Sequence, residues 1–129
     1  MDRCILGGGD SHMAYGLLQQ TELAKLHLEM LGATDSYRRY LATWQANAAR
    51  LKKNVGYMEG SLLHKWHGPK AKRGYNSRWK ILETNKFDPF TDLMPDHQGV
   101  LRLTGTKPQL RDDLRAYFRS RQEDSDSLE

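Results

Sequence analysis

The sequence predicts a single α+β domain that is mostly helical and contains a few short strands. Apolar side chains recur at helical spacing, most regularly at Tyr37, Tyr40, Leu41, Trp44, Ala48 and Leu51. Elsewhere, short apolar runs are bounded by glycine and proline, a pattern typical of brief strands and turns. The length of 129 residues suits one small domain or a piece of a larger one. We expect the domain to span residues 1–121, with a disordered acidic tail over 122–129 that ends in a vector-derived Leu128-Glu129.

Two helices are expected in the N-terminal part of the chain. Residues 7–9 form a glycine turn, after which Asp10 and Ser11 are candidate caps for a helix that ends at Gly32. The apolar residues of this helix are Met13, Leu17, Leu23, Leu26, Met30 and Leu31. The helix that carries the regular apolar stripe is expected to begin after Thr34 or Asp35 and to end before residues 54–56.

Strands and helices alternate in the remainder. Residues 55–58 and 61–66 are predicted to form two strands around a turn at Glu59-Gly60. A basic helix over 73–85 follows, with Tyr75, Trp79 and Leu82 on its inner side. Residues 87–90 cannot extend it, because the residue before a proline is pushed to extended geometry. A strand over 99–103 then precedes a last helix with Pro108 in its first turn and an inner face of Leu110, Leu114, Tyr117 and Phe118.

Charge and composition narrow the class of protein. The net charge is +4, and residues 64–80 contain six lysines and arginines but no acid. Such a segment favours an anionic partner such as a phosphate, a nucleotide or a nucleic acid, although a solvated basic face explains it equally well. The single cysteine, Cys4, excludes an intrachain disulfide, which is typical of a reducing compartment. No apolar stretch approaches the length of a membrane span, so we expect a cytoplasmic protein.

Three segments carry residues that could perform chemistry. In the first, Gly7 to Asp10, the glycines allow backbone to approach a ligand, and Asp10 is placed to act as a general base toward a hydroxyl group. A flexible turn followed by a capping aspartate accounts for the same residues, and by spacing alone it is the stronger explanation.

The second segment contains His64 and His67. Residues three apart on a strand point to opposite faces, so both imidazoles could bind one metal only if the chain turns at Trp66. We expect instead that one histidine binds a metal or contacts a diphosphate and that the other has a structural role.

The third segment places Lys70, Lys72, Arg73 and Arg78 beside Tyr75 and Trp79. Guanidinium and ammonium groups suit phosphate oxygens, and aromatic rings can stack on a base or a sugar. The same pattern would serve single-stranded nucleic acid, and it also fits an ordinary amphipathic helix.

In their order along the chain, these motifs resemble bacterial and phage glycosyltransferase-like proteins. They are more distantly similar to the C-terminal halves of the beta-galactosyltransferases and polypeptide N-acetylgalactosaminyltransferases. The resemblance covers nearly the whole chain, and its most specific part is the run from Trp66-His67-Gly68 through Arg73-Gly74-Tyr75 to Phe87-Asp88-Pro89.

The resemblance implies the C-terminal part of a GT-A type α/β domain. It implies that Asp10 is the catalytic base, near an acceptor site for which Gly8, Gly9 and Tyr75 are candidates. It also implies that His67 or His64 completes a site for a divalent metal, Mn²⁺, together with an Asp-x-Asp motif upstream. Candidate contacts to the donor phosphates are Arg73, Arg78, Lys70 and Trp66, the two arginines stabilising the leaving diphosphate.

This sequence departs from the family pattern at its start. No tryptophan precedes the glycines, a single acid follows them, and no Asp-x-Asp motif lies upstream. We therefore expect a fragment that is inactive alone and needs a missing N-terminal half to bind the nucleotide-sugar donor and transfer its sugar to a glycan acceptor. The alternatives are a small basic module for nucleic acid, which is less favoured, and a non-catalytic interaction domain.

Overall fold

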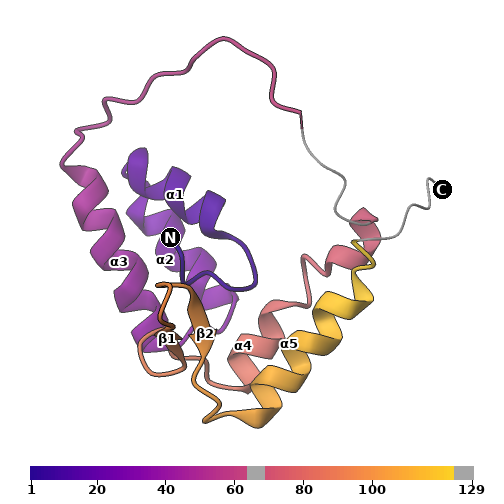
Figure 1. The fold of residues 1–129 in the computed structure, drawn as a ribbon. Helices are drawn as coiled ribbons and strands as arrows, with labels where there is room; N and C mark the ends of the chain where they lie inside the picture. Colours follow the sequence, from indigo (N-terminus) through magenta and orange to yellow (C-terminus); the bar gives the residue numbers. More distant parts are fainter. Residues whose placement is uncertain (64–68, 124–129) are drawn as a thin grey trace.

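The computed structural model describes residues 1–63 and 69–123, and within them the fold is α+β and mostly helical, as predicted. Figure 1 shows the N-terminal helices grouped on one side and the C-terminal helices lying side by side on the other. The elements are α1 (Gly9–Leu17), α2 (Thr21–Met30), α3 (Asp35–Ala49), the short 3-10 helix η1 (Lys70–Arg73), α4 (Trp79–Thr84), β1 (Leu93–Pro95), β2 (Leu101–Leu103) and α5 (Pro108–Ser120). β1 and β2 pair antiparallel, with Leu93 opposite Leu103.

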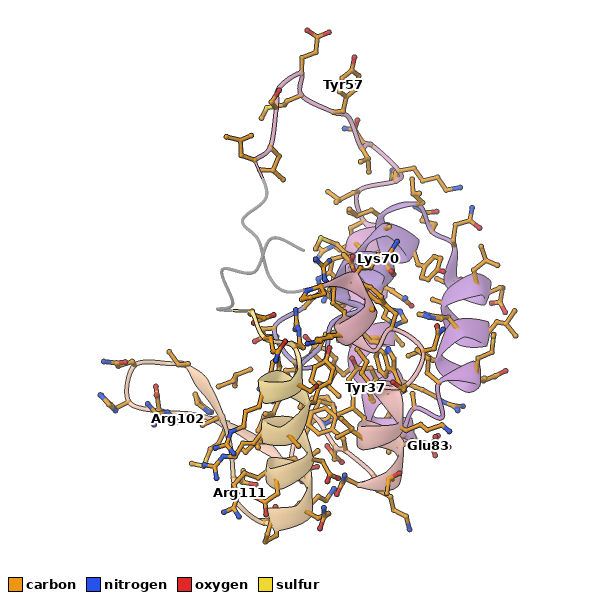
Figure 2. The ribbon with its side chains drawn as sticks, turned by 90° about the vertical axis from the view of Figure 1, so that its right-hand side faces the viewer. Tyr37, Tyr57, Lys70, Glu83, Arg102 and Arg111 are labelled. Atoms are coloured by element: carbon orange, nitrogen blue, oxygen red, sulfur yellow. The ribbon has the colours of Figure 1, made fainter. Side chains whose placement is uncertain are left out.

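The hydrophobic core joins the two groups of helices. Tyr37 of α3 lies at its centre, with its ring centroid 5.8 Å from that of Trp79 and 6.0 Å from that of Phe87. Figure 2 shows Tyr37 between the ribbons, inside the molecule. The buried members are Leu6, Leu28, Tyr37, Leu41, Trp79, Leu82, Phe87, Leu93, Leu110, Leu114 and Tyr117. The larger buried apolar side chains of the described residues therefore form one core that both groups of helices share.

Local signals place α3 and α5 correctly. Thr34 caps α3, since its hydroxyl oxygen accepts a hydrogen bond from the Tyr37 amide at 3.4 Å, and the predicted stripe is buried or half-buried except for Leu51, which lies beyond the helix end. Pro108 opens α5, whose residues Leu110, Leu114 and Tyr117 are buried. Phe118 is 44% exposed, so its predicted inward orientation is wrong.

The single helix expected before Gly32 is wrong, because the chain forms two helices there. Leu18 to Gln20 break it, and Gln19 has a φ of 56°, which no α-helix accommodates. The buried residues are His12 and Gly16 in α1 and Ala24 and Leu28 in α2, while Met13, Leu23, Leu26 and Met30 are exposed. Gly32 does end α2, with a φ of 61° and hydrogen bonds from the Gly32 and Ala33 amides to the carbonyls of Glu29 and Leu28.

The middle of the chain also departs from the prediction. Residues 54–63 contain no strand and extend away from the body (Figure 1), while 64–66 of the predicted hairpin lie outside the described residues. The helix expected over 73–85 is shorter: Gly74, at a φ of 55°, ends η1, and α4 begins only at Trp79. Tyr75 is consequently 47% exposed, whereas Trp79 and Leu82 are buried as expected.

In the C-terminal half, the strand expected over 99–103 is confirmed for 101–103, and its partner β1 was not predicted. No helix in the described part of the chain has the length and apolarity needed to cross a membrane.

Candidate functional site

A cavity of about 450 Å³ lies where the N-terminal loop meets the C-terminal half of the molecule. Its described walls bring together residues that are more than sixty positions apart in the sequence. They are Met1, Cys4, Ile5, Leu6, Gly7, Gly8, Gly9, Asp10, Arg73, Tyr75, Arg78, Phe118 and Arg121. We call this cavity the arginine pocket. It contains Gly8, Gly9, Asp10, Arg73, Tyr75 and Arg78, which are six of the ten predicted site residues.

The glycine loop packs directly against the segment that carries Arg78 and Trp79. Gly7 and Gly8 have φ angles of 84° and 77°, in the left-handed region that glycine adopts without strain. A Cβ atom on Gly7 would lie 3.0 Å from Nη2 of Arg78, and one on Gly8 would lie 2.9 Å from Cζ2 of Trp79. The absence of side chains in this loop therefore allows the guanidinium group and the indole to approach the backbone.

Asp10 does not cap α1, contrary to the prediction for Asp10 and Ser11. The N-cap residue is Gly8, whose carbonyl accepts a hydrogen bond from the His12 amide at 3.1 Å, and α1 begins at Gly9. Asp10 lies within the first turn, where a carboxylate interacts favourably with the helix dipole. Gly9 and Asp10 of this turn belong to the pocket wall.

Tyr75 contacts both Arg73 and Arg78. The Arg78 guanidinium carbon lies 4.9 Å from the ring centroid, and Nη1 of Arg73 donates a hydrogen bond to the Tyr75 hydroxyl oxygen at 3.3 Å. This hydrogen bond, together with the charges of Arg73, Arg78 and Lys70, lowers the pKa of the Tyr75 hydroxyl. The Tyr117 hydroxyl in turn donates to the Arg73 carbonyl at 2.9 Å, which ties η1 to α5.

The charge balance of the pocket favours an anion. Three arginines and one carboxylate line its described walls, and Nε of Arg78 and Nε of Arg121 are buried with no hydrogen-bond partner within the described residues. Guanidinium groups offer paired N–H donors to phosphate oxygens, so the charge of the pocket suits a phosphate group. The thiol of Cys4 does not change this balance, because burial raises its pKa and keeps it protonated at neutral pH.

The remaining predicted site residues do not line this pocket. Lys70 lies on η1 (Figure 2). It is exposed, and it is not among the described lining residues. Trp66, His64 and His67 lie outside the described residues.

A divalent cation does not fit the described pocket on its own. Asp10 is the only carboxylate among the lining residues that the structure describes, and three guanidinium groups oppose a positive charge there. Within residues 1–63 and 69–123, no three of the histidines, cysteines and acids gather in a metal-binding cluster.

Arg121 and Phe118 are pocket residues that sequence reasoning missed. They come from the end of α5, forty or more positions after Arg78, so no local motif links them to the glycine loop. Helical spacing in α5 could have indicated Arg121, because it follows the buried Tyr117 by four residues and therefore lies on the same face of the helix.

Compared with known proteins, the chain matches no family model, no curated protein and no solved structure. The family resemblance of its motifs therefore stays a prediction, and the pocket is the basis for a functional proposal.

Proposed function

We propose that this chain is the acceptor-side unit of a glycosyltransferase and that the arginine pocket faces the diphosphate of a nucleotide-sugar donor. The observation that carries the proposal is the meeting of Asp10 with Arg73 and Arg78 around one cavity. A transferase needs a base for the acceptor hydroxyl and positive charge for the leaving group within one substrate's length of each other. The described walls of the pocket supply both.

In the proposed reaction, the acceptor hydroxyl loses its proton to the Asp10 carboxylate as its oxygen attacks the anomeric carbon of the donor sugar. The bond between that carbon and the phosphate oxygen breaks, and the electron pair leaves with the nucleoside diphosphate. Arg73 and Arg78 stabilise the charge that develops on this diphosphate. The glycine loop, with Gly8 and Gly9, and the exposed ring of Tyr75 leave room for a glycan acceptor beside Asp10.

The proposal includes two parts that the described residues do not supply. The donor-binding portion of a GT-A type domain would come from sequence outside these 129 residues. The Mn²⁺ ion expected from the resemblance would be held by His67 or His64 together with that portion. Because the described pocket does not fit a metal by itself, no step above is assigned to one.

The proposal predicts that Asp10→Asn abolishes sugar transfer in the native protein that carries this chain. Removing a general base lowers kcat by about a hundredfold or more, whereas KM for the donor should stay within about twofold because the arginines remain. Steady-state transfer from a labelled nucleotide sugar measures both constants.

Asp35→Asn is the matched control, because Asp35 is also an exposed carboxylate in the first turn of a helix. The control variant should keep its kcat, since Asp35 lies outside the described pocket lining. Unchanged turnover in Asp10→Asn would remove Asp10 from the chemistry and, with it, the basis of the proposal.

A non-catalytic interaction domain is a second candidate, and one observation favours it. Residues 57–63 carry the large side chains of Tyr57, Met58, Leu62 and Leu63, which are between 85% and 94% exposed. Figure 2 shows Tyr57 on a segment that extends away from the helices. Contiguous exposed apolar side chains mark surfaces that bind another protein or domain. A double variant, Tyr57→Ser with Leu62→Ser, tests this function. Loss of binding to a partner protein with normal sugar transfer would show that the segment is an interaction surface.

A further inference from the structure

We infer that Arg121 is a third phosphate-binding residue and that the arginine pocket binds the diphosphate group of a nucleoside diphosphate. For the identity of this ligand the inference rests on the proposed function. The role of Arg121 as an anion contact rests on the geometry of the pocket alone.

Arg121 is held in place by aromatic rings from its own helix. It follows the last residue of α5, and its guanidinium carbon lies 5.7 Å from the ring centroids of both Tyr117 and Phe118. Its side chain is only 16% exposed, although it is charged. Long cationic side chains are rarely buried to this extent unless an anion meets them.

One anion already meets Arg121 in the structure. Nη2 of Arg121 forms an ion pair with the Glu123 carboxylate, two residues further along the chain. Glu123 is 37% exposed, and partly exposed ion pairs contribute little stability, so a phosphate group can replace this carboxylate. Nε of Arg121 is not satisfied by Glu123 or by any other described residue.

The three arginines converge on one cavity from three separate elements. Arg73 belongs to η1, Arg78 precedes α4, and Arg121 follows α5. Each guanidinium group offers parallel N–H donors that match pairs of phosphate oxygens, so several of them suit a diphosphate better than a single carboxylate. Gly9 and Asp10, the first residues of α1, line the same cavity.

The remaining walls favour a nucleoside attached to that diphosphate. Tyr75 and Phe118 line the pocket and are 47% and 44% exposed, so their rings are available to a base or a ribose. A cavity of about 450 Å³ also lies within the range of small-molecule sites.

The test is isothermal titration of the whole 129-residue chain with inorganic pyrophosphate and with uridine diphosphate at low salt. Arg121→Gln should weaken pyrophosphate binding about tenfold or more, because it removes charge-assisted hydrogen bonds. Arg119→Gln is the matched control, since Arg119 is an exposed arginine in the last turn of α5 and outside the described pocket lining. The control should change the affinity less than about twofold. Equal losses in the two variants, or no pyrophosphate binding by the unmodified chain, would overturn the inference.

Because Arg121 packs on Tyr117, Arg121→Gln could unfold the end of α5. Arg121→Lys is therefore measured beside it, with circular dichroism as a check on the helix content. Lysine keeps the positive charge but lacks the parallel N–H donors of a guanidinium group. The affinity of Arg121→Lys for pyrophosphate should therefore lie between those of the unmodified chain and Arg121→Gln. Binding by Arg121→Lys as tight as that of the unmodified chain would contradict phosphate recognition by the guanidinium group.

Two further arms separate the possible outcomes. If a single-stranded oligonucleotide displaces uridine diphosphate and binds more tightly than it does, the pocket belongs to a nucleic-acid module and the inferred ligand is wrong. If Arg121→Gln loses diphosphate binding while Asp10→Asn keeps full sugar transfer, the role of Asp10 as the base is wrong and the phosphate-binding role of Arg121 stands. If Asp10→Asn loses transfer while Arg121→Gln binds the diphosphate normally, the transferase proposal stands and the phosphate-binding role of Arg121 is wrong.

Discussion

Gly8 lies at a position where both the backbone and the packing require a residue without a Cβ atom. Its φ of 77° is in the left-handed region, and a Cβ atom would lie 2.9 Å from the ring of Trp79, which is 5% exposed and cannot move aside easily. We predict that Gly8→Ala lowers the free energy of unfolding by about 2–4 kcal/mol, the sum of backbone strain and overpacking. Urea denaturation followed by tryptophan fluorescence measures the change.

Gly99→Ala separates these two causes. Gly99 has almost the same φ, 78°, but a Cβ atom there would meet nothing within 4 Å. Gly99→Ala should therefore lower the free energy of unfolding only through backbone strain, by about 1 kcal/mol. A cost for Gly8→Ala no larger than that for Gly99→Ala would show that the contact between the glycine loop and Trp79 contributes nothing to stability.

Among single residues, sequence reasoning identified Asp10, Arg73, Tyr75 and Arg78, and the structure brings all four to one cavity. It could not identify the contact partner of each. Gly8 meets Trp79 and Gly7 meets Arg78 across the fold, and no local periodicity relates residues that far apart. Arg121 was missed for the same reason.

At the scale of elements, α1 and α2 enclose an unusual pair of histidines. His12 is fully buried, neither of its ring nitrogens has a hydrogen-bond partner within the described residues, and its ring centroid lies 5.2 Å from that of His27. Burial, reinforced by the charge of His27 and only partly opposed by Asp10, lowers the pKa of His12 to about 4. The imidazole therefore stays neutral in the folded protein under conditions in which the unfolded chain binds a proton.

This pair predicts a loss of stability in mild acid. Between pH 6.5 and about 4 the unfolded chain holds more protons at this position, so the free energy of unfolding falls as the pH falls through this window. The loss attributable to His12 reaches about 3 kcal/mol by pH 4 and is absent above pH 7. Urea denaturation at a series of pH values measures it.

The matched variants for this prediction are His12→Leu and His97→Gln. His12→Leu removes the titrating group and should flatten the pH dependence in this window, whereas His97, which is exposed in the turn between β1 and β2, should leave it unchanged when replaced. The same slope in His12→Leu as in the unmodified chain would show that another group causes the acid sensitivity.

The helices whose capping residues and apolar spacing are both visible in the sequence could be predicted, and the other elements could not. α3 has a capping threonine and a continuous apolar stripe, and α5 has a proline in its first turn. The break between α1 and α2 has no glycine or proline, and it forms because α2 must fold back against α1 and α3. Strands were predicted over 55–58 and 61–66, but strands need partners, and the described residues provide none for residues 55–63.

At the scale of the whole molecule, the segment 54–63 separates two halves that share a single core. The N-terminal half contributes Leu28, Tyr37 and Leu41, and the C-terminal half contributes Trp79 and Phe87. We predict that chymotrypsin cuts first between Tyr57 and Leu63, because these side chains are almost fully exposed. The two fragments should stay associated in size-exclusion chromatography without denaturant, because separating them would expose the shared core.

The same digest in concentrated urea provides the control for this experiment. There the fragments should separate, and aromatic sites in the core should be cut as readily as Tyr57. Fragments that separate without urea would contradict a core shared across the whole chain, and a first cut elsewhere would show that another segment is more accessible.

The sequence by itself determined the elements whose causes are local: the helices α3 and α5, the end of α2 at Gly32, and the residue types suited to phosphate and proton chemistry. Tertiary structure alone decided where α1 ends, that residues 54–63 form no strand, and that Asp10, Arg78 and Arg121 line one pocket. The physical reason is that caps and periodicity act over a few residues. The pocket and the core depend on contacts between segments that only the folded chain brings together.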